Sequence, residues 1–178
     1  MPHSTHAAQT SADRLEALIE RQGQPVVINR GIERETLRTD GSARLSLTPH
    51  PASLGNKLTH PSITTDFSES QLELITPVFQ SVDALLHDLT ATHQFVTRQL
   101  GKERLWPGSM PSILPDEQAI PLADYGSSNL GRLKKTYRNG LGLRYNRIMQ
   151  TICAVHYNFS LSDADWDGLR NIESRDEE

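Results

Sequence analysis

The segment of residues 31–38, GIERETLR, places two acidic side chains two positions apart. It follows a β-branched run at residues 25–28, so we expect a β-strand. Alternate side chains of a strand share a face, and Glu33 and Glu35 would project side by side, with Ile32 and Thr36 on the other face. Two carboxylates this close repel, so either one pKa rises or a cation bridges them. A strand with a solvated acidic face is the simpler alternative, and this segment alone favours it.

A second acidic strand is predicted within residues 63–77. Gln71, Glu73 and Ile75 alternate with Leu72 and Leu74, and a proline ends the run. Glu73 would therefore project from one face of this strand. Asp66 lies just upstream in a predicted turn.

Residues 149–161 show the clearest alternation in the chain. We predict a strand with one buried apolar face, formed by Cys153, Val155, Tyr157, Phe159 and Leu161. The other face carries His156, Asn158 and Ser160. A lone histidine on a strand is usually structural, but a polar row that faces carboxylates on neighbouring strands is typical of a lined cavity.

Three helices are predicted from capping residues and apolar spacing. The first runs from Ser11 to about Gln22, and the second from Ser81 to about Leu100. The third starts near Leu130, after the turn-rich residues 125–129. Its basic residues either form a solvated face or lie near phosphate or carboxylate groups; they are Arg132, Lys134, Lys135, Arg138, Arg144 and Arg147.

Composition limits the class of protein. The 178 residues suit one domain or part of a larger one, and the net charge of −4 without a basic block argues against a nucleic-acid partner. The single cysteine, Cys153, lies in an apolar run and is predicted to be a buried thiol. Residues 1–10 are predicted to be disordered and lack a signal-peptide pattern. No apolar stretch is long enough to cross a bilayer, so we expect a cytoplasmic protein without a membrane partner.

Several motifs, in order, resemble the glutamate–cysteine ligase (γ-glutamylcysteine synthetase) family in its proteobacterial form. Because they occur in the order of the family, they are more specific than any one short motif. They cover roughly residues 20–165. The motifs are residues 31–38 (GIERETLR), 58–60 (LTH), 63–67 (ITTDF), 74–77 (LITP), 104–111 (RLWPGSMP), 125–129 (YGSSN) and 155–160 (VHYNFS).

The resemblance implies an α+β fold, with a glutamine-synthetase-like curved, mainly antiparallel sheet and helices on its outer face. It implies ATP-dependent joining of the L-glutamate γ-carboxylate to the L-cysteine amine, the first step of glutathione biosynthesis. Mg²⁺ would be the cofactor and ATP a co-substrate.

The resemblance also implies site residues. The metal-surrounding residues would be Glu33, Glu35, Asp66, Glu73 and His156. Imidazole is an unusual Mg²⁺ ligand, so His156 could act behind the ligands or contact phosphate instead. Phe67, Tyr137 and Gln150 match positions near the cysteine pocket, and Arg138 matches a catalytic position suited to an anionic group. Simple packing of Tyr137 and solvation of Arg138 are the alternatives.

Family members are much longer than this chain. We expect residues 11–165 to form the N-terminal part of the ligase catalytic domain, incomplete here and with open strand edges, and residues 166–178 to form an atypical acidic tail. Two other hypotheses stay open. The chain could be a truncated, non-catalytic fragment, or it could belong to a related carboxylate–amine ligase with a different amine substrate.

Overall fold

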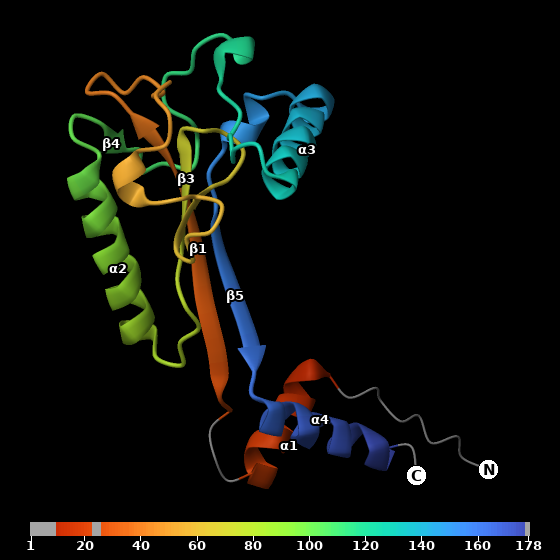
Figure 1. Ribbon diagram of the computed structural model, residues 1–178. Coiled ribbons are helices and arrows are strands. Elements are labelled where there is room, and N and C mark those ends of the chain that lie inside the picture. Colours follow the sequence, from red (N-terminus) through yellow and green to blue (C-terminus); the bar gives the residue numbers. More distant parts are fainter. Residues whose placement is uncertain (1–9, 23–25, 177–178) are drawn as a thin grey trace. The chain divides into compact units, whose positions relative to one another are not determined.

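The computed structural model describes residues 10–22 and 26–176 (Figure 1). The predicted disorder of residues 1–10 therefore lies outside the described residues, apart from Thr10. The chain divides into two compact units, one formed by residues up to Arg30 together with those from Phe159 onward, and the other by residues 31–158. Among the described residues, no helix combines the length and apolar character needed to span a membrane.

An antiparallel sheet is built around one long strand, β1. Its neighbours β3 and β4 pair with it antiparallel, and β3 pairs antiparallel with β2. β5 also pairs with β1, running in the opposite direction (Figure 1), and the Glu35 amide donates to the Ala154 carbonyl at 3.0 Å. The five strands are β1 (Ile28–Thr39), β2 (Ile63–Thr65), β3 (Gln71–Ile75), β4 (Arg104–Leu105) and β5 (Val155–Leu161). The expected antiparallel α+β architecture is confirmed.

The two faces of the sheet differ because apolar and acidic residues alternate along β1 and β3. Glu35 lies opposite Glu73, and the next pair along the strands, Arg34 and Leu74, faces the other way. Helix α2 (Val82–Gln99) packs against this other face. The core there consists of Leu54, Ile63, Leu72, Leu74, Val96 and Leu100. The predicted Ser81 cap is confirmed, because its Oγ accepts the Ala84 amide at 3.3 Å.

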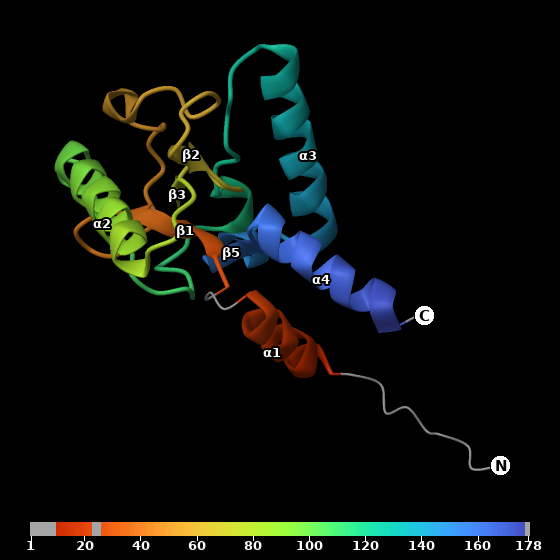
Figure 2. The same ribbon diagram turned by 90° about the horizontal axis from the view of Figure 1, so that it is seen from below.

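Helix α3 (Asn129–Tyr145) lies on the opposite side of the sheet from α2 (Figures 1 and 2). Ser128 caps it by accepting the Gly131 amide at 3.1 Å. Gly131 permits a close approach to the preceding loop, since a Cβ at this position would lie only 2.6 Å from the Tyr125 carbonyl oxygen. Despite its glycines, the helix is unbroken to Tyr145.

A second core lies beside the end of β1. It contains Leu37, Leu45, Ile120 and Cys153, and the predicted burial of the thiol is confirmed. Residues 43–47, beside this core, form no strand and make only isolated bridges. Three single-turn 3-10 helices complete this unit: Ala52–Leu54, Glu117–Ala119 and Met149–Thr151.

The prediction for β5 was wrong in two respects, where the strand begins and whether its apolar face is buried. The strand begins only at Val155, after a 3-10 turn, and Val155 and Tyr157 are 56% and 55% exposed. Alternation identifies the residues that share a face, but it cannot say whether another element covers that face. Here the described residues leave it open.

The smaller unit contains α1 (Ser11–Gln22) and α4 (Asp163–Asp176), which pack against each other. Thr10, and not the predicted Ser11, caps α1: its Oγ1 accepts the Asp13 amide at 3.2 Å. Ser162 caps α4 in the same way, and α4 includes most of the predicted acidic tail at residues 166–178.

Candidate active site

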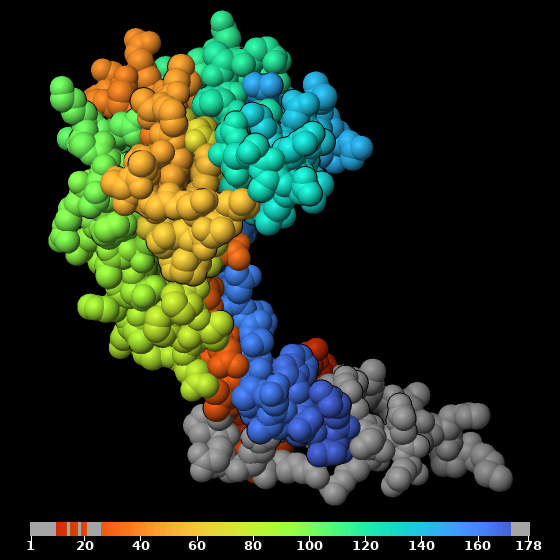
Figure 3. Space-filling model, in the orientation of Figure 1, coloured from red at the N-terminus to blue at the C-terminus, as the bar shows by residue number. Residues whose placement is uncertain are grey.

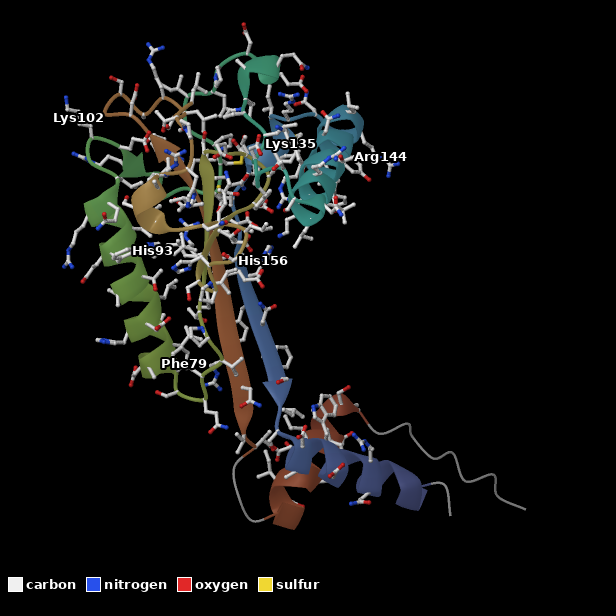
Figure 4. All side chains as sticks on the ribbon, viewed as in Figure 1. Phe79, His93, Lys102, Lys135, Arg144 and His156 are labelled. Carbon is white, nitrogen blue, oxygen red and sulfur yellow. The ribbon has the colours of Figure 1, made fainter. Side chains whose placement is uncertain are left out.

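Four carboxylates and one imidazole meet on the sheet face opposite α2. We call Glu33, Glu35, Asp66, Glu73 and His156 the acidic cluster. Glu33 and Glu35 share a face of β1, and Glu73 is directly opposite Glu35 on β3. His156, labelled on β5 in Figure 4, has its Nδ1 3.2 Å from Glu33 Oε2 and 3.8 Å from Glu35 Oε1. Three strands thus bring together residues from distant parts of the sequence.

Hydrogen bonds from β5 and its approach orient the two β1 carboxylates. Asn158 Nδ2 donates to Glu33 Oε1 at 3.0 Å. The Ala154 amide donates to Glu35 Oε2 at 2.8 Å, and Gln71 Nε2 lies 3.4 Å from the same oxygen. Glu35 is only 6% exposed. Its position is therefore fixed before any ligand arrives.

Nearby cationic groups only partly compensate the charge repulsion within the acidic cluster. Burial, with the nearby charges of Asp66, Glu33 and Glu35, raises the pKa of Glu73 to about 7. Burial also raises the pKa of Glu35 and of Asp66 above their usual values. Raised pKa values of this origin mean that a bound cation would stabilise the charged carboxylates.

Asp66 lies in the turn between β2 and β3, where α3 reaches it. The guanidinium Nε of Arg138 donates to the Asp66 backbone carbonyl, and Arg138 Nη1 donates to the Lys134 carbonyl at 3.1 Å. The space-filling view shows α3 directly against the segment that contains β2 (Figure 3). Burial raises the pKa of Asp66, and the Arg138 charge partly opposes that rise.

The three predicted substrate-binding residues, Phe67, Tyr137 and Gln150, do not form a cluster as the acidic residues do. Phe67 is 2% exposed and lies under α3, where a Cβ on Gly142 would be 3.4 Å from its Cζ. Tyr137 is 63% exposed on α3, next to Arg138. Gln150 is half-buried in the 3-10 turn before β5. Among the described residues, no hydrogen bond or ring contact joins these three.

The donor chemistry fits a hard divalent cation, although the ligands are not assembled into a closed cage. Within the described part of the chain, no group of three or more His, Cys, Asp or Glu side chains is positioned to hold one metal ion. Mg²⁺ commonly takes only one or two carboxylates and completes its shell with water and substrate phosphates. Paired, only partly compensated carboxylates such as Glu35 and Glu73 suit that pattern.

Sequence reasoning missed two residues that shape the site, Tyr125 and Lys134. Residues 125–129 indicated a turn, a helix cap and a family motif but no role for the Tyr125 ring, and Lys134 was one of several basic residues on a helix. In the structure, Lys134 Nζ and the Arg138 guanidinium lie 5.0 Å and 4.7 Å from the Tyr125 ring centroid. The i, i+4 spacing of Lys134 and Arg138 was the available signal for this pairing.

Comparisons with known proteins agree with this geometry. The family model described as "Glutamate-cysteine ligase" matches residues 15–178. A protein named glutamate–cysteine ligase from Edwardsiella ictaluri is 56% identical over 84% of this chain and 29% of its own length. One of the same name from Pseudomonas aeruginosa PAO1 is 55% identical over 80% of this chain and 27% of its own. This chain thus spans less than a third of these relatives.

Solved structures show the same relationship. The chain is similar to a glutamate–cysteine ligase from Francisella tularensis in complex with AMP, with a TM-score of 0.80 and 42% identity over 86% of this chain and 30% of that one. It also resembles a bifunctional glutathione synthetase from Pasteurella multocida, with a TM-score of 0.75 and 34% identity over 90% of this chain and 20% of that one. The chain belongs to the glutamate–cysteine ligase family.

Proposed function

We propose that this chain forms part of an ATP-dependent ligase that joins the γ-carboxylate of L-glutamate to the amine of L-cysteine in the cytoplasm. The proposal rests on the acidic cluster, in which Glu35 and Glu73 face each other and, among the described residues, form no ion pair with a lysine or arginine. The names of the similar proteins support the reaction, and the AMP in the Francisella tularensis structure supports use of an adenine nucleotide.

A carboxylate does not acylate an amine unaided. The γ-phosphoryl group of ATP passes to the glutamate carboxylate oxygen, with release of ADP. The cysteine amine nitrogen then forms a bond to the acyl carbon, phosphate leaves with the former carboxylate oxygen, and the amine loses a proton. When bound, Mg²⁺ supplies positive charge that offsets repulsion between the phosphates and the attacking carboxylate.

The residues of this chain would bind and orient the reactants. Glu33, Glu35, Asp66 and Glu73 would hold the metal, and His156 would contact the metal or a phosphate. Asn158 and the Ala154 amide already fix the β1 carboxylates. Arg138 would contact an anionic group beside Asp66. Phe67, Tyr137 and Gln150 would border the cysteine pocket.

Metal binding by the chain itself is the first test. Calorimetric titration with MgCl₂ should show saturable binding that Glu35→Gln and Glu73→Gln weaken about tenfold or more. Glu20→Gln, on the exposed surface of α1, is the matched control and should leave binding unchanged. Equal binding by all four proteins would remove the acidic cluster from the proposal.

Turnover is a separate test. The purified chain with ATP, Mg²⁺, glutamate and cysteine should release phosphate that depends on both amino acids. If phosphate release is absent while Mg²⁺ binding depends on Glu35, this chain is a metal-binding part of a ligase and does not catalyse the reaction alone. If another amine replaces cysteine, the related-ligase hypothesis is correct.

A further inference from the structure

The ring of Tyr125 gathers three cationic side chains from two parts of the chain. Lys57 Nζ lies 5.6 Å from the ring centroid, Lys134 Nζ 5.0 Å and the Arg138 guanidinium 4.7 Å. The ring is 6% exposed, and its hydroxyl donates to the Thr65 carbonyl at 2.5 Å. Tyr125 is therefore a fixed platform that attracts cations through its ring face.

Only one of these three cations is neutralised within the described residues. Lys57 forms a buried ion pair with Glu69. Lys134 Nζ and the Arg138 guanidinium have no carboxylate within 4.0 Å in the described part of the chain. Two positive side chains held against one ring repel each other, and a small anion between or beside them would offset that repulsion.

These two cations lie next to the acidic cluster. The Arg138 guanidinium donates to the backbone carbonyl of Asp66, a member of the cluster. Both cations are on α3, whose close approach to the Tyr125 loop depends on Gly131. A ligand that is held by metal ions bound to the acidic cluster could thus present an anionic group to α3.

We propose that Lys134 and Arg138, held on the Tyr125 ring, form a binding site for a small anionic group, a phosphate or a carboxylate, of a substrate. The inference rests on the proposed function for the identity of the substrate, but not for the binding itself. It adds Lys134 as a binding residue and Tyr125 as a positioning residue for both cations.

The neighbouring Lys135 provides a matched control. It is on the same helix and carries the same charge, but its ammonium already pairs with Asp124 Oδ2 at 2.6 Å. Loss of either lysine changes the net charge equally. A non-specific electrostatic effect would therefore weaken anion binding equally in Lys134→Gln and Lys135→Gln.

The test is a titration of the ¹⁵N-labelled chain with inorganic phosphate, and separately with acetate, at constant ionic strength and with EDTA present. We expect saturable amide shifts in α3 and around Tyr125 for the unaltered chain. Lys134→Gln should weaken binding about tenfold, Lys135→Gln less than twofold, and Lys134→Arg should retain binding. The stronger of the two anions identifies the group as phosphate or carboxylate.

Equal weakening by Lys134→Gln and Lys135→Gln, or no saturable shift with either anion, would overturn the inference. Circular dichroism of each variant checks that the fold is retained, which the partial exposure of Lys134 favours. The EDTA separates this result from the proposed function. If the chain binds the anion but not Mg²⁺, the anion site is supported and the ligase proposal is not. If it binds Mg²⁺ but not the anion, the ligase proposal is supported and the anion site is not.

Discussion

Two groups of charged side chains lie around β1, and they are neutralised differently. We call Arg38, Lys57, Glu69 and Glu103 the paired cluster. Arg38 is 0% exposed, and its Nη1 lies 2.7 Å from Glu103 Oε2, while Lys57 pairs with Glu69. In the acidic cluster, Glu35 and Glu73 face one another, and within the described part of the chain neither forms an ion pair with a lysine or arginine; the imidazole of His156 lies 3.8 Å from Glu35. By strand alternation, Arg38 and Glu35 point to opposite faces.

The pKa values of the glutamates show the difference. Burial alone would raise the pKa of Glu69, but Lys57 and the Asp124 and His50 amides bring it below its usual value. Burial likewise opposes ionisation of Glu103, and Ser46, Thr48 and Arg38 lower its pKa overall. The pKa of Glu73 rises to about 7 instead. The ion pairs of the paired cluster stabilise the fold, whereas the carboxylates of the acidic cluster would be stabilised by a bound cation.

The largest expected effect comes from breaking the paired cluster. Arg38→Met leaves Glu103 partly buried without its cation, and it also removes donors to Thr48 and the Glu69 carbonyl. We expect the free energy of unfolding in urea to fall by about 3–5 kcal/mol. Arg44→Met, at an exposed arginine, should change it by less than about 0.5 kcal/mol. Similar small losses in both variants would mean that the paired cluster does not hold the fold.

The acidic cluster should respond in the opposite direction. Without Mg²⁺, burial and the neighbouring acids disfavour the ionised form of Glu73 in the folded chain. They raise its pKa from the ordinary value of 4.5 to about 7. The folded protein then binds more protons than the unfolded chain between these values, so this group costs stability as the pH rises. Glu73→Gln should therefore be relatively more stable at pH 8 than at pH 5.

Urea unfolding at both pH values in EDTA measures this difference. Glu20→Gln is the control and should show no such pH dependence. A Glu73→Gln variant that is less stable than the unaltered chain at pH 8 would contradict the unneutralised character of the acidic cluster.

His50 gives a pH dependence to the paired cluster. Burial, with the nearby charge of Lys57, lowers its pKa from 6.5 to about 4. The unfolded chain therefore binds the proton first, and the stability from this group is complete above pH 6.5 and is lost as the pH falls toward 4. His50→Gln should flatten that part of the profile in thermal unfolding, and His87→Gln, at an exposed site, should not. Identical profiles for both variants would exclude His50 as the cause.

The smallest expected effect is at an exposed ion pair. Lys135 and Asp124 are 51% and 53% exposed, and solvent screens their attraction. Lys135→Gln should change the free energy of unfolding by no more than about 1 kcal/mol. A loss as large as that of Arg38→Met would show that burial does not decide which charge pairs stabilise this fold.

Local patterns in the sequence predicted the acidic face well. Alternation placed Glu33 and Glu35 together on β1, and Glu73 on β3, and Ser81 was recognised as a cap. Contacts between distant segments could not be predicted in this way. The Arg38–Glu103 pair joins residues 65 positions apart. Whether Val155 is exposed or covered depends on which other elements lie beside β5. Periodicity carries no information about such pairings.

A divalent cation located on the chain would distinguish the two clusters most directly. Mn²⁺ can replace Mg²⁺ and broaden the NMR signals of nearby amides. We predict that substoichiometric Mn²⁺ broadens signals around Glu33, Glu35, Glu73 and His156 most strongly, that excess Mg²⁺ restores them, and that signals around Glu103 are broadened less. Broadening centred on the paired cluster or spread over surface acids, with the β1 and β3 signals unchanged, would contradict a cation site in the acidic cluster.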